Sequence, residues 1–333
     1  MKLANTVALI NAKLLTSPSI NSFEKIVFDA SKVKRGDLFI AFSTEHIEQA
    51  VNSGAYGIVF DTPTQVLDNE IAWLEVESVE NALLKLLRFT LIEKNVKAYE
   101  CDEVTLKLAS SIKTSNELIV LDSSLKDSAN KLYVIEEGSE VLFNEDTTPA
   151  DLFVDFEYIS KATPLKIETI EQTLFEVSFI FDNKFYERRT LSPFFMPYLE
   201  NLLNFYRSKN IDFKIKQFIN VQHFKPLFVT NSLEVKEFGL TQKVLIFEPS
   251  AKLFKTQIEF MKNRATWANI IYIIPHLHTL NFENSDNIFT YEDEEDIIEL
   301  LKTMEYNFAL IVGVDESILT TQATIKQQLS LDF

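Results

Sequence analysis

Glycine is scarce in this chain of 333 residues, and half of the glycines lie in one short segment. Of the six glycines, Gly36, Gly54 and Gly57 fall within residues 27–60. Glycine is the residue that most easily turns the backbone with positive φ or lets a ligand approach it closely. The segment therefore indicates a small, defined fold. Elsewhere the chain has too few glycines to build a glycine-rich phosphate-binding loop.

Composition narrows the class of protein. Hydrophobic residues make up 46% and charged residues 24%, which is typical of a globular protein with two or three domains at this length. The net charge of −17 opposes phosphate backbones and anionic membrane surfaces, so we expect no direct nucleic-acid binding. Cys101 is the only cysteine, which excludes an intrachain disulfide and fits a cytoplasmic location. The N-terminus makes a poor signal peptide and no apolar run could span a bilayer, so we expect no membrane insertion.

Residues 1–95 are predicted to form the first of three α/β blocks. Apolar runs and helical spacing predict strands at 25–28, 37–42 and 56–60 and helices at 46–53 and 79–91. Gly54 is well placed to end the first helix in a left-handed conformation. Ser78 is a suitable N-cap for the second, because its hydroxyl can accept a hydrogen bond from a free backbone N–H.

The second block, residues 96–238, is rich in short apolar runs. The expected strands are 118–121, 132–135, 141–143, 152–156 and 175–181. Pro193 and Pro197 interrupt the pattern. Amphipathic spacing then predicts two helices, at 198–207 and 213–221.

The third block, residues 239–319, alternates strands with helices. Strands are expected at 244–247, 269–274 and 308–312, and helices at 251–262 and 293–304. This alternation is typical of a parallel sheet with crossover helices, so the block is predicted to be Rossmann-like. Residues 320–333 are polar at first and are expected to form a flexible tail.

Three short motifs in the first block share their order and spacing with a known family. Residues 29–33 read DASKV, residues 36–41 read GDLFIA, and Gly54-Ala55 precedes an apolar strand. They resemble the Asp-Ser-Arg-x-Val, Gly-(Asp)-Leu-Phe-Val-Ala and Gly-Ala motifs of the UDP-sugar-binding domain of Mur ligases, above all the MurE and MurF branch. Weaker resemblances to the later domains of the family lie at residues 191–221, 244–249 and 291–315.

The resemblance implies an α/β protein with a three-block Mur-ligase-like architecture, a reduced central domain and a Rossmann-like C-terminal domain. It also implies that a UDP-sugar-like ligand binds in the first block. Carried over by position, the ligand-binding residues would be Asp29, Ala30, Ser31, Gly36, Asp37 and His46. Ala30 and Ser31 stand where the family has Ser and Arg, and a family Asp-Gly-His turn is missing or reduced to His46.

The central block departs from the family in its nucleotide site. Mur ligases carry a Gly-x-Asn-Gly-Lys-Thr-type loop whose backbone N–H groups and Lys bind phosphates. The corresponding residues 96–108 read VKAYECDEVTLKL, with no glycine. Glu100, Asp102 and Glu103 stand where phosphates would bind, and like charges in contact cost about one to several kcal/mol. We therefore expect no nucleotide cofactor and no acyl-phosphate chemistry.

Other candidate sites have simpler explanations. His276 and His278 form a His-Leu-His pair without a nearby third ligand, so no metal site is expected.

The last six residues read QLSLDF and resemble peptides that bind the bacterial sliding clamp. In that hypothesis Gln328, Leu329, Leu331 and Phe333 enter an apolar groove on the partner.

The favoured hypothesis is a non-catalytic cytoplasmic binding or scaffolding protein linked to peptidoglycan precursor synthesis. Its partner would be a Mur ligase or another cell-wall synthesis protein. One alternative is an active ATP-dependent amide-bond ligase with a rewritten nucleotide site. The other is a protein associated with the sliding clamp through its tail.

Overall fold

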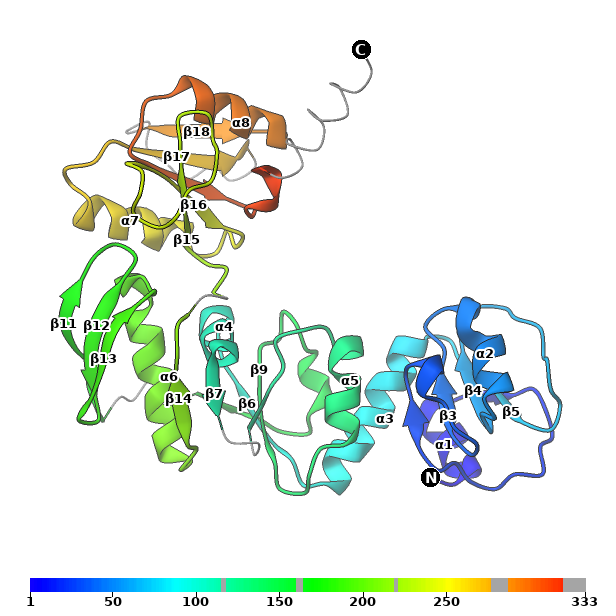
Figure 1. Ribbon diagram of the computed structural model, residues 1–333. Helices are drawn as coiled ribbons and strands as arrows, with labels where there is room; N and C mark the ends of the chain where they lie inside the picture. Colours follow the sequence, from blue (N-terminus) through cyan, green and yellow to red (C-terminus); the bar gives the residue numbers. More distant parts are fainter. Residues whose placement is uncertain (115–117, 160–163, 219–220, 277–286, 320–333) are drawn as a thin grey trace, which may run out of the picture. The chain divides into compact units, whose positions relative to one another are not determined.

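The computed structural model describes residues 1–114, 118–159, 164–218, 221–276 and 287–319 (Figure 1). The chain divides into two compact units. Unit 1 consists of Met1–Leu106, Thr114–Ser160 and Lys209–Asp212, and unit 2 of Lys107–Lys113, Lys161–Ser208 and Phe213–Phe333. Both units mix helices with parallel strands, so the predicted α/β class is confirmed. The block boundaries after residues 95 and 238 remain a prediction.

Unit 1 begins with a five-stranded sheet in the order β1-β5-β4-β3-β2. The strands are β1 (Lys13–Leu14), β2 (Ile26–Val27), β3 (Leu38–Ile40), β4 (Gly57–Phe60) and β5 (Ala72–Glu75). Strands β2 to β5 run parallel, and β1 is antiparallel to β5. The strands predicted at 25–28, 37–42 and 56–60 are therefore confirmed, and each observed strand is shorter than its predicted range.

Helices cover both faces of this sheet because its strands are apolar on both sides. On one face, α1 (Leu3–Ile10) and α3 (Val79–Glu93) pack against side chains such as Leu38 and Leu74. On the other face, α2 (Ile47–Asn52) and the 3-10 helix η1 (Ala30–Lys32) pack against residues such as Trp73. A further 3-10 helix, η2 (Thr44–His46), leads into α2.

The predicted helix ends in this block are also confirmed. The Ser78 hydroxyl accepts a hydrogen bond of 3.2 Å from the backbone N–H of Asn81 at the start of α3. Gly54 follows α2 with a φ of 93°. A side chain there would meet the Arg35 backbone at 3.2 Å, so both conformation and space favour glycine.

A second sheet in unit 1 is wholly parallel and has the order β10-β6-β9-β8. The strands are β6 (Lys97–Glu100), β8 (Leu118–Val120), β9 (Glu140–Phe143) and β10 (Glu157–Tyr158), and the accompanying helices are α4 (Glu103–Ser111), α5 (Leu125–Tyr133) and η3 (Ala150–Leu152). Leu83 and Leu87 of α3 share one core with Leu132 of α5 and Phe143 of β9. The long helix α3 thus contributes to the cores of both sheets.

Two strands predicted in this region are wrong. Residues 132–135 begin in the last turn of α5, which Ser124 caps by accepting the Asp127 N–H at 3.3 Å. Leu132 and Ile135 are buried in the core beside α5, whereas Val134 is 74% exposed just after the helix ends. Residues 152–156 begin with the last residue of η3 and continue as irregular chain, in which Leu152, Phe153 and Phe156 pack into the same core.

Unit 2 contains a three-stranded antiparallel sheet in the order β11-β12-β13. Its strands are β11 (Glu168–Gln172), β12 (Val177–Phe181) and β13 (Lys184–Arg189), followed by η4 (Pro193–Phe195) and α6 (Met196–Ser208). Strand β12 and helix α6 confirm the predictions at 175–181 and 198–207. The helix predicted at 213–221 is wrong, because β14 (Phe213–Ile215) pairs with β7 (Ile112–Thr114).

The last part of unit 2 is a five-stranded sheet in the order β15-β16-β19-β17-β18. The elements are β15 (Lys225–Val229), β16 (Lys243–Glu248), α7 (Phe254–Arg264), β17 (Ile270–Pro275), β18 (Ile288–Tyr291), α8 (Glu294–Thr303) and β19 (Phe308–Val312). Only β15 is antiparallel. The predicted Rossmann-like alternation is confirmed, with two edge strands that were not expected. Among the described residues, no helix combines the length and apolar character needed to cross a bilayer.

Candidate functional site

A pocket of about 430 Å³ in unit 1 brings together most of the residues that the sequence singled out. It opens beyond the carboxyl ends of β2 and β3, where parallel α/β sheets commonly bind ligands. Asp29, Ala30, Ser31 and His46 all line it. The pocket therefore unites two segments, η1 and η2, that are separated by strand β3 in the sequence.

Asp29 and Ser31 are held in place by a local hydrogen-bonded turn. The Asp29 carboxylate accepts the Ser31 N–H at 3.0 Å and the Ser31 hydroxyl at 2.7 Å, and it caps η1. The Lys32 ammonium lies 3.4 Å from the same carboxylate. The hydrogen bonds from the Ser31 hydroxyl and N–H lower the pKa of Asp29. Asp29 is therefore a fixed anion whose remaining lone pairs face solvent.

Lys126 adds a cation to the pocket lining, and His46 and Ser43 add further hydrogen-bonding groups. His46 ends η2, whose start is capped by Ser43 accepting the Glu45 N–H at 3.2 Å. Lys126, from the first turn of α5, also lines the pocket, and its ammonium nitrogen lies 4.5 Å from the centre of the Phe42 ring. A cation over an aromatic face is attracted to the ring quadrupole, which positions Lys126 at the pocket.

Gly36 and Asp37 do not line this pocket. They form the turn before β3, where Gly36 has a φ of 101° and Asp37 is buried. The Asp37 carboxylate accepts the Lys34 N–H at 2.9 Å. Its backbone carbonyl accepts the Tyr56 N–H at 2.8 Å. Gly36 and Asp37 therefore stabilise the turn before β3. A ligand-binding role for these two residues remains a prediction.

The resemblance places the counterpart of the family's phosphate loop in residues 96–108, which include the connection between β6 and α4. Only Cys101 and Asp102 separate the strand from the helix. The Asp102 carboxylate accepts the Thr105 N–H at 2.9 Å and the Thr105 hydroxyl at 2.7 Å. A negative side chain of this chain therefore already occupies the N-terminus of α4, the place where a phosphate would be stabilised.

Neighbouring acids reinforce the negative character of this connection. Glu100 is buried at the end of β6, and its carboxylate accepts the hydroxyl of Tyr158, which raises the pKa of that tyrosine. Glu103 lies in the first turn of α4. Burial raises the pKa of the Cys101 thiol, which donates to the Phe143 carbonyl at 3.6 Å. A buried, protonated thiol is a poor nucleophile.

The remaining sequence candidates give no site in the described part of the chain. No group of three or more His, Cys, Asp or Glu residues there could hold a metal ion. His278 and the tail residues Gln328, Leu329, Leu331 and Phe333 lie outside the described residues. The clamp-binding hypothesis therefore remains a prediction.

No protein-family model matches the sequence, and neither does any curated protein. Among solved structures, MurF from Acinetobacter baumannii is similar over 96% of this chain and 98% of its own, with a TM-score of 0.52 at 10% sequence identity. The chain has the fold of a Mur ligase. MurF from Thermotoga maritima in complex with ADP covers 93% of this chain and 98% of its own, at 14% identity and a TM-score of 0.47.

This comparison confirms the architecture that the motifs in residues 29–55 predicted. The match to A. baumannii MurF spans nearly the whole chain, so the Mur ligase fold extends beyond the first block. At 10% identity the likeness concerns the fold, and the chemistry has to be argued from the residues of this chain.

Proposed function

We propose that this protein is a non-catalytic member of the Mur ligase fold that binds a sugar-nucleotide precursor of peptidoglycan. The observation that carries the proposal is the Asp102 carboxylate bound at the N-terminus of α4. An ATP-dependent ligase needs that helix end for phosphates, because its free N–H groups and dipole favour an anion. Here the anion is part of the protein.

The energetic cost of placing ATP at this position is large. A phosphate would have to displace the Asp102 carboxylate and approach Glu103. Two like charges about 4 Å apart repel each other by about 1 kcal/mol in bulk water and by about 4 kcal/mol near a protein surface. The two-residue connection also contains no glycine, so its backbone cannot surround a phosphate.

The pocket in unit 1 supports the binding part of the proposal. Lys126 and His46 offer positive or hydrogen-bonding groups to a diphosphate, and Ser31 and Ser43 offer hydroxyls to a sugar. The Phe42 ring adds an apolar surface beside the lysine. A volume of about 430 Å³ lies within the usual range for a small-molecule site. The hydrogen-bonding groups and the size of the pocket thus suit a sugar nucleotide.

Calorimetric titration with a UDP-MurNAc-peptide tests the proposal. We expect binding without Mg-ATP, and we expect Lys126→Ala to weaken it about tenfold by removing a charge-assisted contact. Lys131→Ala is the matched control, since Lys131 is exposed on the same helix and lies outside the pocket. Equal affinities for the two variants would contradict the assigned pocket.

A second titration addresses catalysis. We expect no heat of binding for Mg-ATP and no phosphate release in the presence of the sugar nucleotide. ATP turnover would establish the alternative, an active ligase with a rewritten nucleotide site. If the protein is non-catalytic, its role in the cytoplasm would be to scaffold or regulate a cell-wall synthesis enzyme. Co-purification with a Mur ligase would identify that partner.

A further inference from the structure

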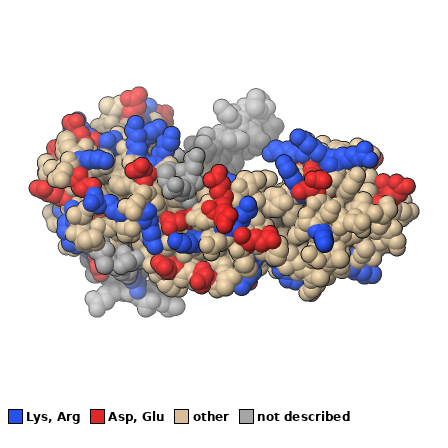
Figure 2. Space-filling model, turned by 90° about the horizontal axis from the view of Figure 1, so that it is seen from below, with Lys and Arg blue, Asp and Glu red and all other residues tan. Residues whose placement is uncertain are grey.

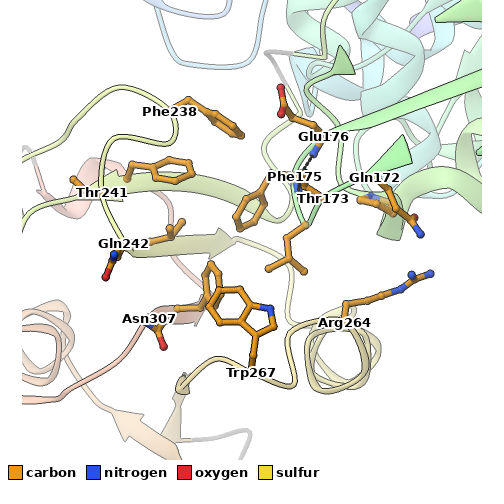
Figure 3. A pocket seen from close by; sticks show the side chains of 15 residues that line it. Gln172, Thr173, Phe175, Glu176, Phe238, Thr241, Gln242, Arg264, Trp267 and Asn307 are labelled. Carbon is orange, nitrogen blue, oxygen red and sulfur yellow. Dashed lines mark hydrogen bonds between the residues drawn. The ribbon is translucent and has the colours of Figure 1, made fainter. Parts of the chain in front are cut away.

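A second and larger pocket lies wholly within unit 2. It has a volume of about 840 Å³ and lies between the turn joining β11 to β12 and the first residues of β16 and β19 (Figure 3). In a parallel sheet, the carboxyl ends of the strands are the usual ligand edge. This pocket is at the amino ends, so it is distinct from that edge and from the site in unit 1.

Aromatic rings form the walls of the pocket. Phe175, Phe228 and Phe308 are buried, whereas Trp267 is 73% exposed and Phe238 is 47% exposed. The Trp267 ring packs edge-on against Phe308 at 5.8 Å, and the Phe238 ring lies 4.7 Å from Phe228. Each of the two accessible rings, Trp267 and Phe238, therefore packs against a buried phenylalanine ring. Figure 3 shows Phe238 and Trp267 on opposite sides of the pocket.

The rim is lined by carboxamides. Gln172 and Arg264 lie on one side of the pocket, and Gln242 and Asn307 on the other (Figure 3). The Asn307 oxygen accepts the Asn269 N–H at 2.9 Å, which leaves its NH₂ group for a ligand. Within the described part of the chain, the Gln172 and Gln242 side chains make no hydrogen bond. Carboxamides both donate and accept, so they suit hydroxyl groups.

The charges around the pocket exclude a strongly anionic ligand. Among the described residues that line it, only Arg264 and Glu176 are charged, and their charges balance. Helix α7 ends at Arg264, so the helix end at this pocket is the carboxyl end, whose dipole disfavours anions. A nucleotide or polyphosphate is therefore a poor match. A purely apolar ligand would leave the rim carboxamides without partners.

We propose that this pocket binds a neutral carbohydrate. The C–H face of a pyranose ring can stack on Trp267 or Phe238, because an aromatic face carries partial negative charge. The hydroxyl groups at the edge of the same ring can then face Gln242 and Asn307 on one side of the pocket or Gln172 on the other. This combination of an apolar face and a polar edge is what the pocket offers.

Tryptophan fluorescence gives a direct test. The chain has two tryptophans; Trp73 is fully buried in unit 1, and Trp267 is the one in this pocket. Chitotriose, cellotriose and maltotriose are titrated at millimolar concentrations into the whole protein. We expect at least one of them to shift the emission of the native chain and to leave Trp267→Phe unchanged.

Two variants that keep both tryptophans locate the site. Gln242→Ala should weaken the binding of the responding sugar about tenfold by removing a rim hydrogen bond. Leu240→Ala is the matched control, because Leu240 is 69% exposed in the same loop but does not line the pocket. Far-ultraviolet circular dichroism confirms that both variants are folded.

Three results would overturn the proposal. The first is the absence of any emission change with all three sugars. The second is a change that persists in Trp267→Phe, since it would then come from Trp73. The third is a response to a proline-rich peptide alone, which would assign the aromatic walls to a protein partner. Because the site lies in unit 2, the first and third results do not bear on sugar-nucleotide binding in unit 1, whereas the second would place the bound sugar near Trp73 in unit 1.

Discussion

At the scale of single residues, Asp102 has a structural role, and in the proposed function it also keeps phosphates away from the N-terminus of α4. Its carboxylate caps α4 through Thr105, so Asp102→Ala should lower the free energy of unfolding by about 1 kcal/mol. The variant should still not bind Mg-ATP, because Glu100 and Glu103 remain and no glycine is added. Urea unfolding and calorimetry measure the two effects.

The control for Asp102 is Asp155→Ala, which removes an exposed aspartate that makes no hydrogen bond or ion pair within the described residues. We expect its stability to stay within about 0.5 kcal/mol of the native protein. If both variants had the same stability, the capping role would be disproved. If Asp102→Ala bound Mg-ATP, the carboxylate alone would have been blocking a latent nucleotide site.

Cys101 illustrates how burial sets chemical reactivity. Burial raises the pKa of its thiol, and the adjacent acids Asp102 and Glu100 add to the effect. A thiol reagent should therefore react with the native protein at pH 8 only as fast as the chain opens. In 6 M urea one thiol per chain should react at once, since the chain has one cysteine. Rapid labelling without urea would contradict the buried position.

At the scale of elements, helix α8 should give a clear pH dependence. Asp296 accepts the N–H groups of Glu292 at 3.0 Å and Asp293 at 3.3 Å, and these hydrogen bonds lower its pKa from 3.8. A carboxylate whose pKa is lower in the folded state than in the unfolded state stabilises the folded protein. This stabilisation is complete when the pH is above the pKa of the unfolded state, and it is lost as the pH falls through the pKa of the folded state. Asp296→Asn should therefore be less stable than the native protein at pH 7, and this difference should shrink as the pH falls below 3.8.

Urea unfolding between pH 7 and pH 3 measures this difference. Glu299→Gln provides the control, because Glu299 is exposed in the middle of the same helix. We expect its effect to be small and nearly independent of pH over most of this range. A constant difference between native protein and Asp296→Asn at every pH would show that the carboxylate charge is not responsible.

The elements also show which parts of the fold the sequence could predict. Strands β3, β4, β16 and β19 are continuous apolar runs between clear turns, so their pattern sufficed. Residues 132–135 and 213–221 were misassigned because a short apolar run does not distinguish a strand from a helix turn. Strand β14 is determined by pairing with β7, about a hundred residues earlier, which local pattern cannot reveal.

The same limit applies to the candidate site. Asp29, Ser31 and His46 were found because they flank strands with recognisable motifs. Lys126 was missed, since it reaches the pocket from α5, a helix that the sequence did not predict. No short-range signal links a lysine to a pocket formed almost a hundred residues before it. Aromatic residues around the second pocket come from several segments and were equally hidden.

At the scale of the whole molecule, charges of both signs are mixed on the face that Figure 2 shows. The chain carries a net charge of −17, yet the face in Figure 2 shows lysine and arginine side chains among aspartate and glutamate. We therefore expect binding at the two proposed sites to depend on local groups such as Lys126 or Arg264 more than on long-range attraction. This agrees with two pockets of different character, one in each unit.

The two units should unfold in separate steps, because each has its own hydrophobic core. In a Trp267→Phe background, Trp73 reports on unit 1 alone. Leu245→Ala, in the core of unit 2, should cost about 2 to 5 kcal/mol and lower one urea transition seen by circular dichroism. The midpoint of the Trp73 emission change should stay where it was.

Leu74→Ala is the reciprocal variant, since Leu74 lies beside Trp73 in the first sheet of unit 1. It should move the Trp73 midpoint and leave the unit 2 transition in place. If Leu245→Ala shifted the Trp73 midpoint as far as Leu74→Ala does, the chain would unfold as one cooperative body. A ligand for either pocket should then stabilise both units, whereas independent units predict that a sugar nucleotide protects Trp73 alone.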